Sequence, residues 1–452
     1  MEPIVTPEEM AAIDAAAPEP VAELIERAGA AVARAAVQML GGGYGRRVVV
    51  VAGKGNNGND GRAAAARLRR RGVRTLVFEA AAAPRRLPPA DLVIDAAYGT
   101  GLQRPYAAPD PGGAPVLAVD IPSGVDGLTG AEHGDPPTAA RTVTFGALKP
   151  GLLLEPGASR CGAIEVADIG LDVSRARAHR VQESDIAAWY PNRPVAAHKW
   201  QRACWVVGGS PGMAGAAHLA AAAAARAGAG YVRLSTPGDP RPSGPVEVVG
   251  HAIAAEGWGA EVVAQASRFA SVVVGPGLGR RAGTAEEVQD LLAGLAAPAV
   301  VDGDALAVIG GAGLAQLAER VAPTILTPHD GEFEALTGAR PGPDRFAEAR
   351  SLARASGAIV LLKGPCTIVA DPAGGVLVAD TGDARLATAG TGDVLAGAIG
   401  ALLASGMPPL RAAVAAAWVH GQAARYASRT GLVAGDLVQH LPEVLDHATH
   451  VG

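Results

Sequence analysis

The chain has 452 residues, of which 49% are hydrophobic and 18% are charged, and its formal net charge is −5. This length accommodates two domains with full hydrophobic cores and excludes a disordered chain, while the acidic balance argues against a nucleic-acid partner or an anionic membrane. The cysteines Cys161, Cys204 and Cys366 lack metal-ligand spacing and the N-terminus lacks a signal-peptide layout, so we expect a cytoplasmic protein without a membrane partner.

Short β-branched runs alternate with helical segments along the first half, a pattern typical of parallel strands joined by helices. A buried strand opens the stretch VVVVAGKGNNGNDG (48–61), and a helix is predicted over 62–71. Further strands are predicted at 75–78, 92–94, 116–119, 143–145 and 163–166. The stretch WYPNRPVAAHKWQR (189–202) then interrupts the pattern with two prolines.

The alternation restarts after this break. Strands are predicted at 203–207, 231–235, 271–274, 299–301, 324–326 and 359–362, followed by a hairpin-like pair at 367–370 and 376–379. Long alanine-rich helices are predicted at 392–405 and 409–427. We therefore predict two different α/β domains, residues 1–192 and 193–452, with ligands at the strand ends of each.

Lysine is rare in this chain, because the basic residues are nearly all arginine. Codon bias explains most of this excess, but a retained lysine is a candidate for a site where a compact ammonium cannot be replaced by a planar guanidinium. All four lysines lie beside glycine-rich or turn segments: Lys54, Lys149, Lys199 and Lys363.

The segment GKGNNG (53–58) matches the G-x-G-x-x-G pattern of dinucleotide-binding turns. Glu79 ends the next strand, where a ribose-binding acid belongs in a nicotinamide dehydrogenase. However, the turn is rich in amide side chains, and the following loops contain no hydride-transfer partner such as a Tyr-x-x-x-Lys pair. These features favour a different ligand.

Polar residues also follow the next two predicted strands. Asp95, Asp120 and Ser123 lie at the strand ends, where together with Asn57 they could offer oxygen ligands of low total charge to a monovalent cation. A simpler interpretation is that Asp95 and Asp120 cap the following turns. The glycines of GTG (99–101) at the same edge favour a ligand site.

The stretches GKGNNGNDG, DAAYGTGLQRP, VLAVDIPSGVDGLTG and VTFGALKPGLL give residues 1–170 a resemblance to the NAD(P)H-hydrate epimerases. The resemblance implies a Rossmann-like three-layer αβα fold and a substrate that is NADH or NADPH hydrated at C6 of the nicotinamide ring (NADHX or NADPHX). It implies potassium at Asn57, Asp95 and Ser123, and a catalytic Asp120 nearest the reacting ring. The implied hydrate-binding residues are Asn56, Asn57, Gly58, Asn59, Asp60, Gly99, Thr100, Gly101, Leu102, Gln103, Arg104, Pro105 and Asp120. Asn59 replaces a glycine of the family pattern.

The strongest signal in the second half is GTGD (390–393) at the start of a predicted helix. Free backbone N–H groups at a helix start form an anion site, and Asp393 there could act as a general base beside a bound phosphoryl group. Four strand-end stretches accompany it: VVGGSPGMAGAA, VVVGPGLG, ILTPHDGEFEALTG and VLLKGPCTIVA. Taken singly, His329 and Lys363 are ordinary buried or solvated residues; together these stretches predict a phosphate pocket. The P-loop pattern is absent from the sequence.

These stretches give residues 193–452 a resemblance to the ribokinase-like superfamily and, within it, to the ADP-dependent NAD(P)H-hydrate dehydratases. The resemblance implies a second three-layer αβα fold, phosphoryl transfer from ADP to the hydrate, elimination of phosphate to restore NAD(P)H, and magnesium to neutralise phosphoryl charge. Implied hydrate-binding residues are Ala216, Gly277, His329 and the catalytic Asp393. Implied nucleotide-binding residues are Lys363, Gly364, Pro365, Cys366, Thr367 and Gly392. Gly303, Asp330 and Ala389 depart from the family pattern.

The prediction is a bifunctional repair enzyme: one domain epimerises the R and S hydrates and the other dehydrates the S form, converting ADP to AMP and phosphate. A homo-oligomer is expected from apolar surface on helices within 1–40 and 409–427. One alternative is a ribokinase-type vitamin or sugar kinase with a nucleotide-binding N-terminal domain. Another is a redox sensor that binds NAD(H) at 53–61 and whose second half has degenerated, although Lys363 and Asp393 are both intact.

Overall fold

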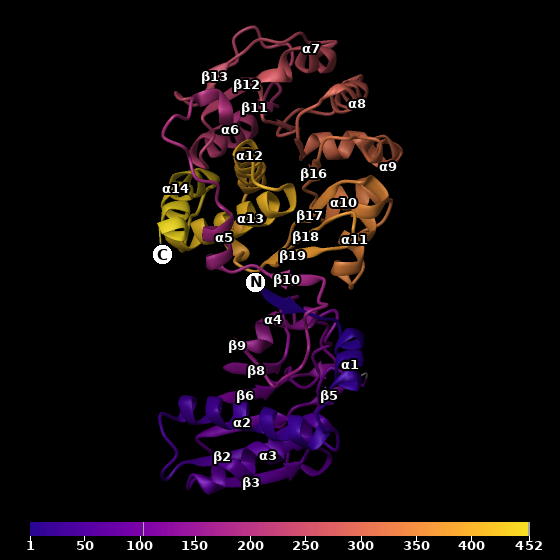
Figure 1. Ribbon diagram of the computed structural model, residues 1–452. Coiled ribbons are helices and arrows are strands. Elements are labelled where there is room, and N and C mark those ends of the chain that lie inside the picture. Colours follow the sequence, from indigo (N-terminus) through magenta and orange to yellow (C-terminus); the bar gives the residue numbers. More distant parts are fainter. Residues whose placement is uncertain (103, 451–452) are drawn as a thin grey trace. The chain divides into compact units, whose positions relative to one another are not determined.

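The computed structural model describes residues 1–102 and 104–450. The chain divides into two compact units, residues 2–178 and residues 179–452 together with Met1 (Figure 1). The predicted site residue Gln103 lies outside the described residues. None of the described helices is both long and apolar enough to span a bilayer.

The N-terminal unit is built on a six-stranded parallel sheet of order β3-β2-β4-β6-β8-β9. Its strands are β2 (Arg47–Ala52), β3 (Arg74–Glu79), β4 (Leu92–Ala96), β6 (Val116–Val119), β8 (Arg141–Phe145) and β9 (Ala163–Ala167). Short strands β5 (Tyr106–Ala107) and β7 (Gly134–Asp135) pair apart from it, and β1 is Glu2–Ile4. The helices are α1 (Pro7–Ala16), α2 (Val21–Leu40), α3 (Asn56–Arg70) and α4 (Ala158–Cys161).

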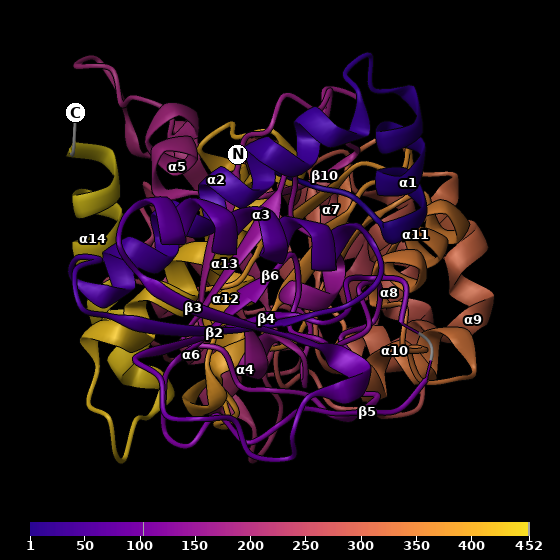
Figure 2. The ribbon, with the colours of Figure 1, turned by 90° about the horizontal axis from the view of Figure 1, so that it is seen from below.

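The two faces of this sheet are covered differently. Helices α2 and α3 pack together against one face, where they bury Val48 and Val50 of β2 (Figure 2). The alternate side chains Val49 and Val51 pack on the other face against Leu87 and other connecting-segment residues. This alternation follows from the period of two along a strand. The sheet therefore has a full helical layer on one side and mainly connecting segments on the other.

The second unit contains a larger sheet in which β10, β19, β18, β17, β16, β15, β14, β11, β12 and β13 are neighbours in that order. Its strands are β10 (Ala178–Arg180), β11 (Ala203–Val207), β12 (Tyr231–Ser235), β13 (Val249–Gly250), β14 (Ser271–Val274), β15 (Ala299–Val301), β16 (Thr324–Leu326), β17 (Ile359–Leu362), β18 (Thr367–Ala370) and β19 (Val376–Ala379). Strands β11 to β17 pair in parallel, and β18 and β19 form an antiparallel extension.

Helices cover this sheet on both sides, and α12 is its central helix. The helices are α5 (Glu183–Trp189), α6 (Ala214–Arg226), α7 (Trp258–Gln265), α8 (Thr284–Gly294), α9 (Asp304–Ala318), α10 (Asp330–Thr337), α11 (Arg345–Ser356), α12 (Thr391–Ala404), α13 (Pro409–Tyr426) and α14 (Ala434–His450). Gly397 lets α12 approach α6 closely, because a Cβ there would overlap the carbonyl oxygen of Ala220. Helices α12 and α6 therefore pack in close contact.

The predicted α/β architecture, the parallel strands and the hairpin pair are confirmed, but several details differ. Helix α3 begins at Asn56, not at residue 62, so the glycine turn and the first turn of the helix overlap. The expected apolar surface of 409–427 is wrong, because the α13 residues from Ala412 to Val419 are buried within the unit's own core.

The division between the units falls at residues 178 and 179 rather than at 192. Residues 179–192 pack with the second unit because Val181 donates a backbone hydrogen bond to Val378 at 2.9 Å. Ile186 of α5 is fully buried in the core of the second unit. Neither interaction has a signature in the local sequence.

Candidate active sites

The N-terminal glycine turn is a close-packed junction between β2 and α3. A Cβ at Gly53 would overlap the carbonyl oxygen of Ala97, and one at Gly58 would overlap the carbonyl of Gly53. These glycines therefore allow backbone contacts that a side chain would block. Asn59 causes no crowding, because it lies within the helix and its amide oxygen accepts a hydrogen bond from Arg62 at 3.4 Å.

A cavity of about 560 Å³ opens beside this junction, lined by α1, α2 and the loops that follow β2, β4, β6 and β8. Its volume is in the range of sites that hold small molecules. Predicted site residues that line it are Asn56, Asn57, Asp60, Gly99, Thr100, Gly101, Leu102, Arg104 and Asp120. Gly58, Asn59 and Pro105 are not among the lining residues. The cavity thus brings most of the predicted hydrate-binding set to one place.

Asp120 and Lys149 form an ion pair at the wall of this cavity. The Lys149 ammonium, whose side chain is 1% exposed, lies 2.7 Å from Asp120 Oδ1 and also donates to Thr144 Oγ1 at 2.7 Å. Asp120 has a φ of 67°, and no other non-glycine residue among residues 1–102 and 104–450 has a positive φ. Strained backbone of this kind is typical of functional sites. The sequence identifies Lys149 as an unusual lysine but does not place it in the site.

Two further carboxyl groups line the same cavity. Asp60 of α3 is only 7% exposed, and burial, reinforced by Asp120 and Asp14, raises its pKa to about 8. Burial and Asp120 also raise the pKa of Asp14, against the opposing effect of Lys149. Asp14 comes from α1, whose sequence suggested no site residue. Only the packing of α1 against the strand-end loops reveals it.

Of the three predicted potassium ligands, Asp95 and Ser123 are hydrogen-bonded to each other, and Asn57 lines the cavity described above. Asp95 is buried and accepts hydrogen bonds from Ser123 Oγ at 2.7 Å and Ser123 N at 2.8 Å. Burial raises the pKa of Asp95, and the hydrogen bonds from Ser123 and Ala97 oppose this shift without cancelling it. The buried amide of Asn57 has no hydrogen-bond partner within the described ranges. A carboxylate, a hydroxyl and an unsatisfied amide oxygen fit a weakly held monovalent cation.

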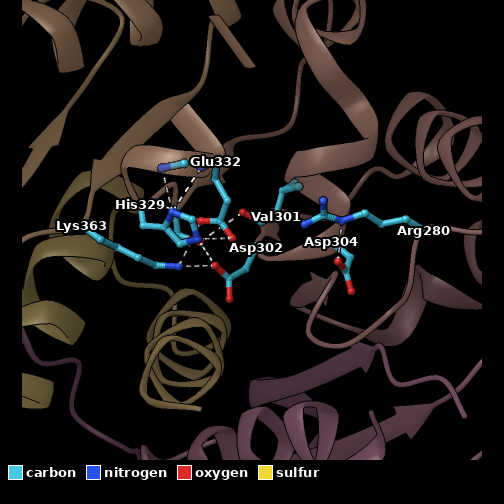
Figure 3. Close-up of polar contacts among 9 residues, drawn as sticks. Arg280, Val301, Asp302, Asp304, His329, Glu332 and Lys363 are labelled. Atoms are coloured by element: carbon cyan, nitrogen blue, oxygen red, sulfur yellow. Dashed lines mark hydrogen bonds and ion pairs between the residues drawn. The ribbon is translucent and has the colours of Figure 1, made fainter. Parts of the chain in front are cut away.

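In the second unit, the predicted loops meet at the carboxyl ends of β11, β14, β15, β16 and β17. Lys363, directly after β17, lies 2.6 Å from Asp302 Oδ1, directly after β15 (Figure 3). Thr327 Oγ1 donates to the same oxygen at 2.6 Å, and Glu332 Oε2 lies 3.7 Å from the lysine. Burial disfavours the charge of Lys363, but Asp302 and Glu332 outweigh it, so that the pKa of Lys363 is raised.

Asp393 lies in the first turn of α12, facing this cluster. Burial, with Asp302 as the next largest cause, raises its pKa to about 7. The position of a Cβ on Gly392 would be 3.4 Å from Lys363 Nζ, so the start of α12 and the lysine are adjacent. Ala389 needs no left-handed conformation, because Gly390 takes it with a φ of 91°. The departure from glycine at 389 therefore leaves this turn intact.

The remaining predicted hydrate-binding residues occupy two loops. His329 caps α10, where its Nδ1 accepts hydrogen bonds from the backbone of Gly331 and Glu332 at 2.9 and 3.2 Å. Its side chain is 60% exposed, and its Nε2 lies 3.6 Å from Glu332 Oε1. The Cβ position of Gly277 lies 3.0 Å from Ala216 Cβ, so these two residues share a surface.

The sequence analysis did not assign three acidic groups that lie in this site. Asp302 and Glu332 pair with Lys363. Asp304 forms an ion pair with Arg280 at 2.9 Å (Figure 3) and accepts a hydrogen bond from the backbone N–H of Gly279 at 2.9 Å. Asp302 and Asp304 lie in the stretch DGDAL, which departs from the family pattern at Gly303. The backbone at Gly303 has a φ of 57°, a left-handed conformation that favours glycine. An acid directly after a buried strand is the signal that could have identified Asp302.

Fold and sites together define a two-domain α/β enzyme, with a polar cavity in a Rossmann-like unit and a phosphate-type site in a ribokinase-like unit. Residues 204–446 match a family model described as NAD(P)H-hydrate dehydratase. Residues 21–88 and 78–151 match one described as YjeF-related protein N-terminus. The chain belongs to the family of bifunctional NAD(P)H-hydrate repair enzymes.

Relatives with that name span both units. The Mycobacterium leprae protein is 42% identical over 348 residues, covering 74% of this chain and 70% of the relative. The Salinibacter ruber protein is 38% identical over 404 residues, covering 81% and 73%, and the Escherichia coli protein is 34% identical over 388, covering 79% and 73%.

Solved structures resemble the second unit. An ADP/ATP-dependent NAD(P)H-hydrate dehydratase from Bacillus subtilis, co-crystallised with ATP and Mg²⁺, is 28% identical and covers 59% of this chain and 97% of its own, with a TM-score of 0.50. A ribokinase-like superfamily protein from Enterococcus faecalis, 21% identical, covers 60% and 96% with a TM-score of 0.52 and shows the fold alone.

Proposed function

We infer that the protein repairs hydrated nicotinamide cofactors: its second unit dehydrates NAD(P)H hydrate at the expense of a nucleotide, and its first unit interconverts the hydrate's epimers. The observation that carries the dehydratase activity is the convergence of Lys363, Asp302 and Glu332 with Asp393 at the start of α12. The kinase alternative is less favoured, because both family models match this chain together.

The dehydration requires activation of a hydroxyl group, since hydroxide is a poor leaving group and phosphate a good one. Asp393 would accept the hydroxyl proton as a general base, and a pKa near 7 suits that role at neutral pH. Backbone N–H groups at the start of α12, including that of Gly392, would hold the phosphoryl group. Loss of phosphate and a ring proton then restores NAD(P)H.

The loop of residues 363–367 and Gly392 would bind ADP or ATP. This loop is anchored, because Arg345 donates to the carbonyl of Lys363 at 3.0 Å and Thr367 donates to that of Gly364 at 3.3 Å. Magnesium bound with the nucleotide would neutralise phosphoryl charge. The acidic side chains Glu332 and Asp302 beside Lys363 would hold it from the protein side.

The first unit would bind the hydrate in its cavity, with Asp120 moving protons at C6 of the nicotinamide ring. Lys149 supports this role, since its ion pair orients the carboxylate and compensates its charge. Potassium at Asn57, Asp95 and Ser123 would satisfy the unpartnered amide and compensate the buried acid. When bound, the ion would supply positive charge at this edge of the sheet.

The direct test is recovery of reduced-cofactor absorbance from a mixture of R and S NADH hydrate. With ADP or ATP and Mg²⁺, the whole mixture should be consumed; without nucleotide, only exchange of the epimers should occur. Replacement of K⁺ by Na⁺ should slow exchange and leave dehydration of the S form unchanged. Absence of recovery with either nucleotide would exclude the proposed dehydratase activity.

A cytoplasmic homo-oligomer remains our proposal for the state in the cell. The three cysteines are buried, which suits a reducing compartment. Light scattering of the purified chain tests the oligomeric state, and a monomer would exclude it.

A further inference from the structure

Asp60 stands out among the groups that line the N-terminal cavity. Its side chain is more than nine-tenths buried, and no hydrogen bond or ion pair to it is formed within residues 1–102 and 104–450. A buried carboxylate without a partner is costly, and the group responds by retaining its proton. Its amide neighbour on α3, Asn57, is also unsatisfied. Both side chains are therefore available to a ligand in the cavity.

The charged surroundings of Asp60 act in the same direction. Asp14 from α1 and Asp120 after β6 both disfavour a second negative charge. Lys149, which lines the cavity, is already bonded through its ammonium group to Asp120, Thr144 and the carbonyl of Phe145. Arg104 is bonded to the hydroxyl of Tyr98 at 3.0 Å. The cavity wall contributed by α2 is apolar.

We propose that the first unit divides proton transfer between two carboxyl groups: Asp60 is the acid that protonates the departing hydroxyl, and Asp120, paired with Lys149, is the base. Asp14 is a positioning residue that acts through Asp60 by keeping it protonated. This division rests on the proposed epimerase function. The division extends that function by assigning an acid, a base and a positioning residue, which come from three different parts of the fold.

The step balances without an oxidant or reductant. The proton of Asp60 passes to the C6 hydroxyl, the C6–O bond breaks, water leaves, and the lone pair of N1 forms a C6–N1 double bond. Water then adds to the opposite face of C6 and gives its proton to the Asp120 carboxylate. Solvent exchange returns both carboxyl groups to their starting states, and the reverse reaction uses the same groups in exchanged roles.

The decisive variant is Asp60→Asn, which preserves size but cannot donate a proton to the hydroxyl oxygen. We expect R-to-S exchange to fall by about 10²-fold or more, the usual contribution of general acid–base catalysis. Dehydration of the S form by the second unit should be unchanged, and an unfolding midpoint at pH 4 equal to that of the wild type reports that the first unit is folded. Asp110→Asn, in the same unit but outside the cavity lining, is the matched control and should retain exchange.

A second variant gives a readout that a purely structural role would not change. Asp14→Asn removes a negative neighbour of Asp60, so its pKa should fall and the acid form should be lost at lower pH. The alkaline limb of the pH profile for exchange should therefore move down by about 0.5 unit, within the range of neighbouring-charge effects. An unmoved limb would exclude Asp14 from this role.

Stability supplies an independent check of the protonated state. Because the pKa of Asp60 is higher in the folded than in the unfolded chain, the folded state loses stability as pH rises from about 4 to about 8. Asp60→Asn should remove this loss and raise the unfolding midpoint at pH 8 but not at pH 4. Retained exchange in Asp60→Asn would overturn the proposal. If the wild-type chain itself shows no exchange, the proposed epimerase function fails instead.

Discussion

The pH dependence of the dehydratase should follow the ionisation of Asp393. Burial of this group, together with Asp302, Glu332 and Asp304, raises its pKa to about 7, whereas Lys363 opposes the shift. A base acts only when deprotonated, so the rate is lost as pH falls through that value. With a midpoint near 7, about one tenth of the enzyme is active at pH 6 and about nine tenths at pH 8.

The structure predicts both the size and the direction of the effect. The value of kcat/KM for S-hydrate with saturating nucleotide should rise about tenfold from pH 6 to pH 8, because this constant reports the free enzyme. Asp393→Asn should abolish the limb and reduce turnover by about 10²–10⁴-fold. Asp304→Asn removes a like charge and should move the limb to lower pH while retaining the base.

The assay is the return of reduced-cofactor absorbance in constant-ionic-strength buffers, with the unfolding midpoint of each variant as the control for folding of the second unit. Asp290→Asn, on α8 and remote from the cluster, serves as the matched charge control. A limb that persists in Asp393→Asn, or one that moves to higher pH in Asp304→Asn, would refute the assignment of Asp393 as the base.

Three other predictions concern the architecture and the ion pair. Lys149→Met should slow R-to-S exchange by about tenfold or more, the value of one charge-assisted hydrogen bond, and leave dehydration intact. A lowered unfolding midpoint of the first unit would indicate misfolding instead. A fragment of residues 179–452 should melt at a higher temperature than one of 193–452, because only the longer fragment contains β10 and buried Ile186; equal melting temperatures would contradict the structural division. Gly397→Val should destabilise the second unit by roughly 1–3 kcal/mol in chemical unfolding, because its side chain would enter the contact with α6. Gly435→Ala in α14, where a Cβ would meet nothing within 4 Å, is the control and should not destabilise the unit.

The local sequence was sufficient for the strands and for most of the polar groups at their ends. Short β-branched runs separated by helices predict parallel strands, and the carboxyl ends of parallel strands meet at one edge. For this reason the sequence alone groups Asn57 with Asp120 in the first half and Lys363 with Asp393 in the second. The resemblance to NAD(P)H-hydrate epimerases and dehydratases then indicated the reactions, and the comparisons with known proteins confirmed the family.

What only the tertiary structure decided depends on contacts between distant segments. Asp14 belongs to the cavity because α1 packs beside loops more than eighty residues away in sequence, and Ile186 belongs to the second unit because α5 packs into its core. The proton affinities of Asp60 and Asp393 are likewise properties of burial and of neighbouring charges. A linear pattern specifies which groups are present; three-dimensional packing determines which of them lose water, and that loss determines which carboxyl group is an acid and which a base.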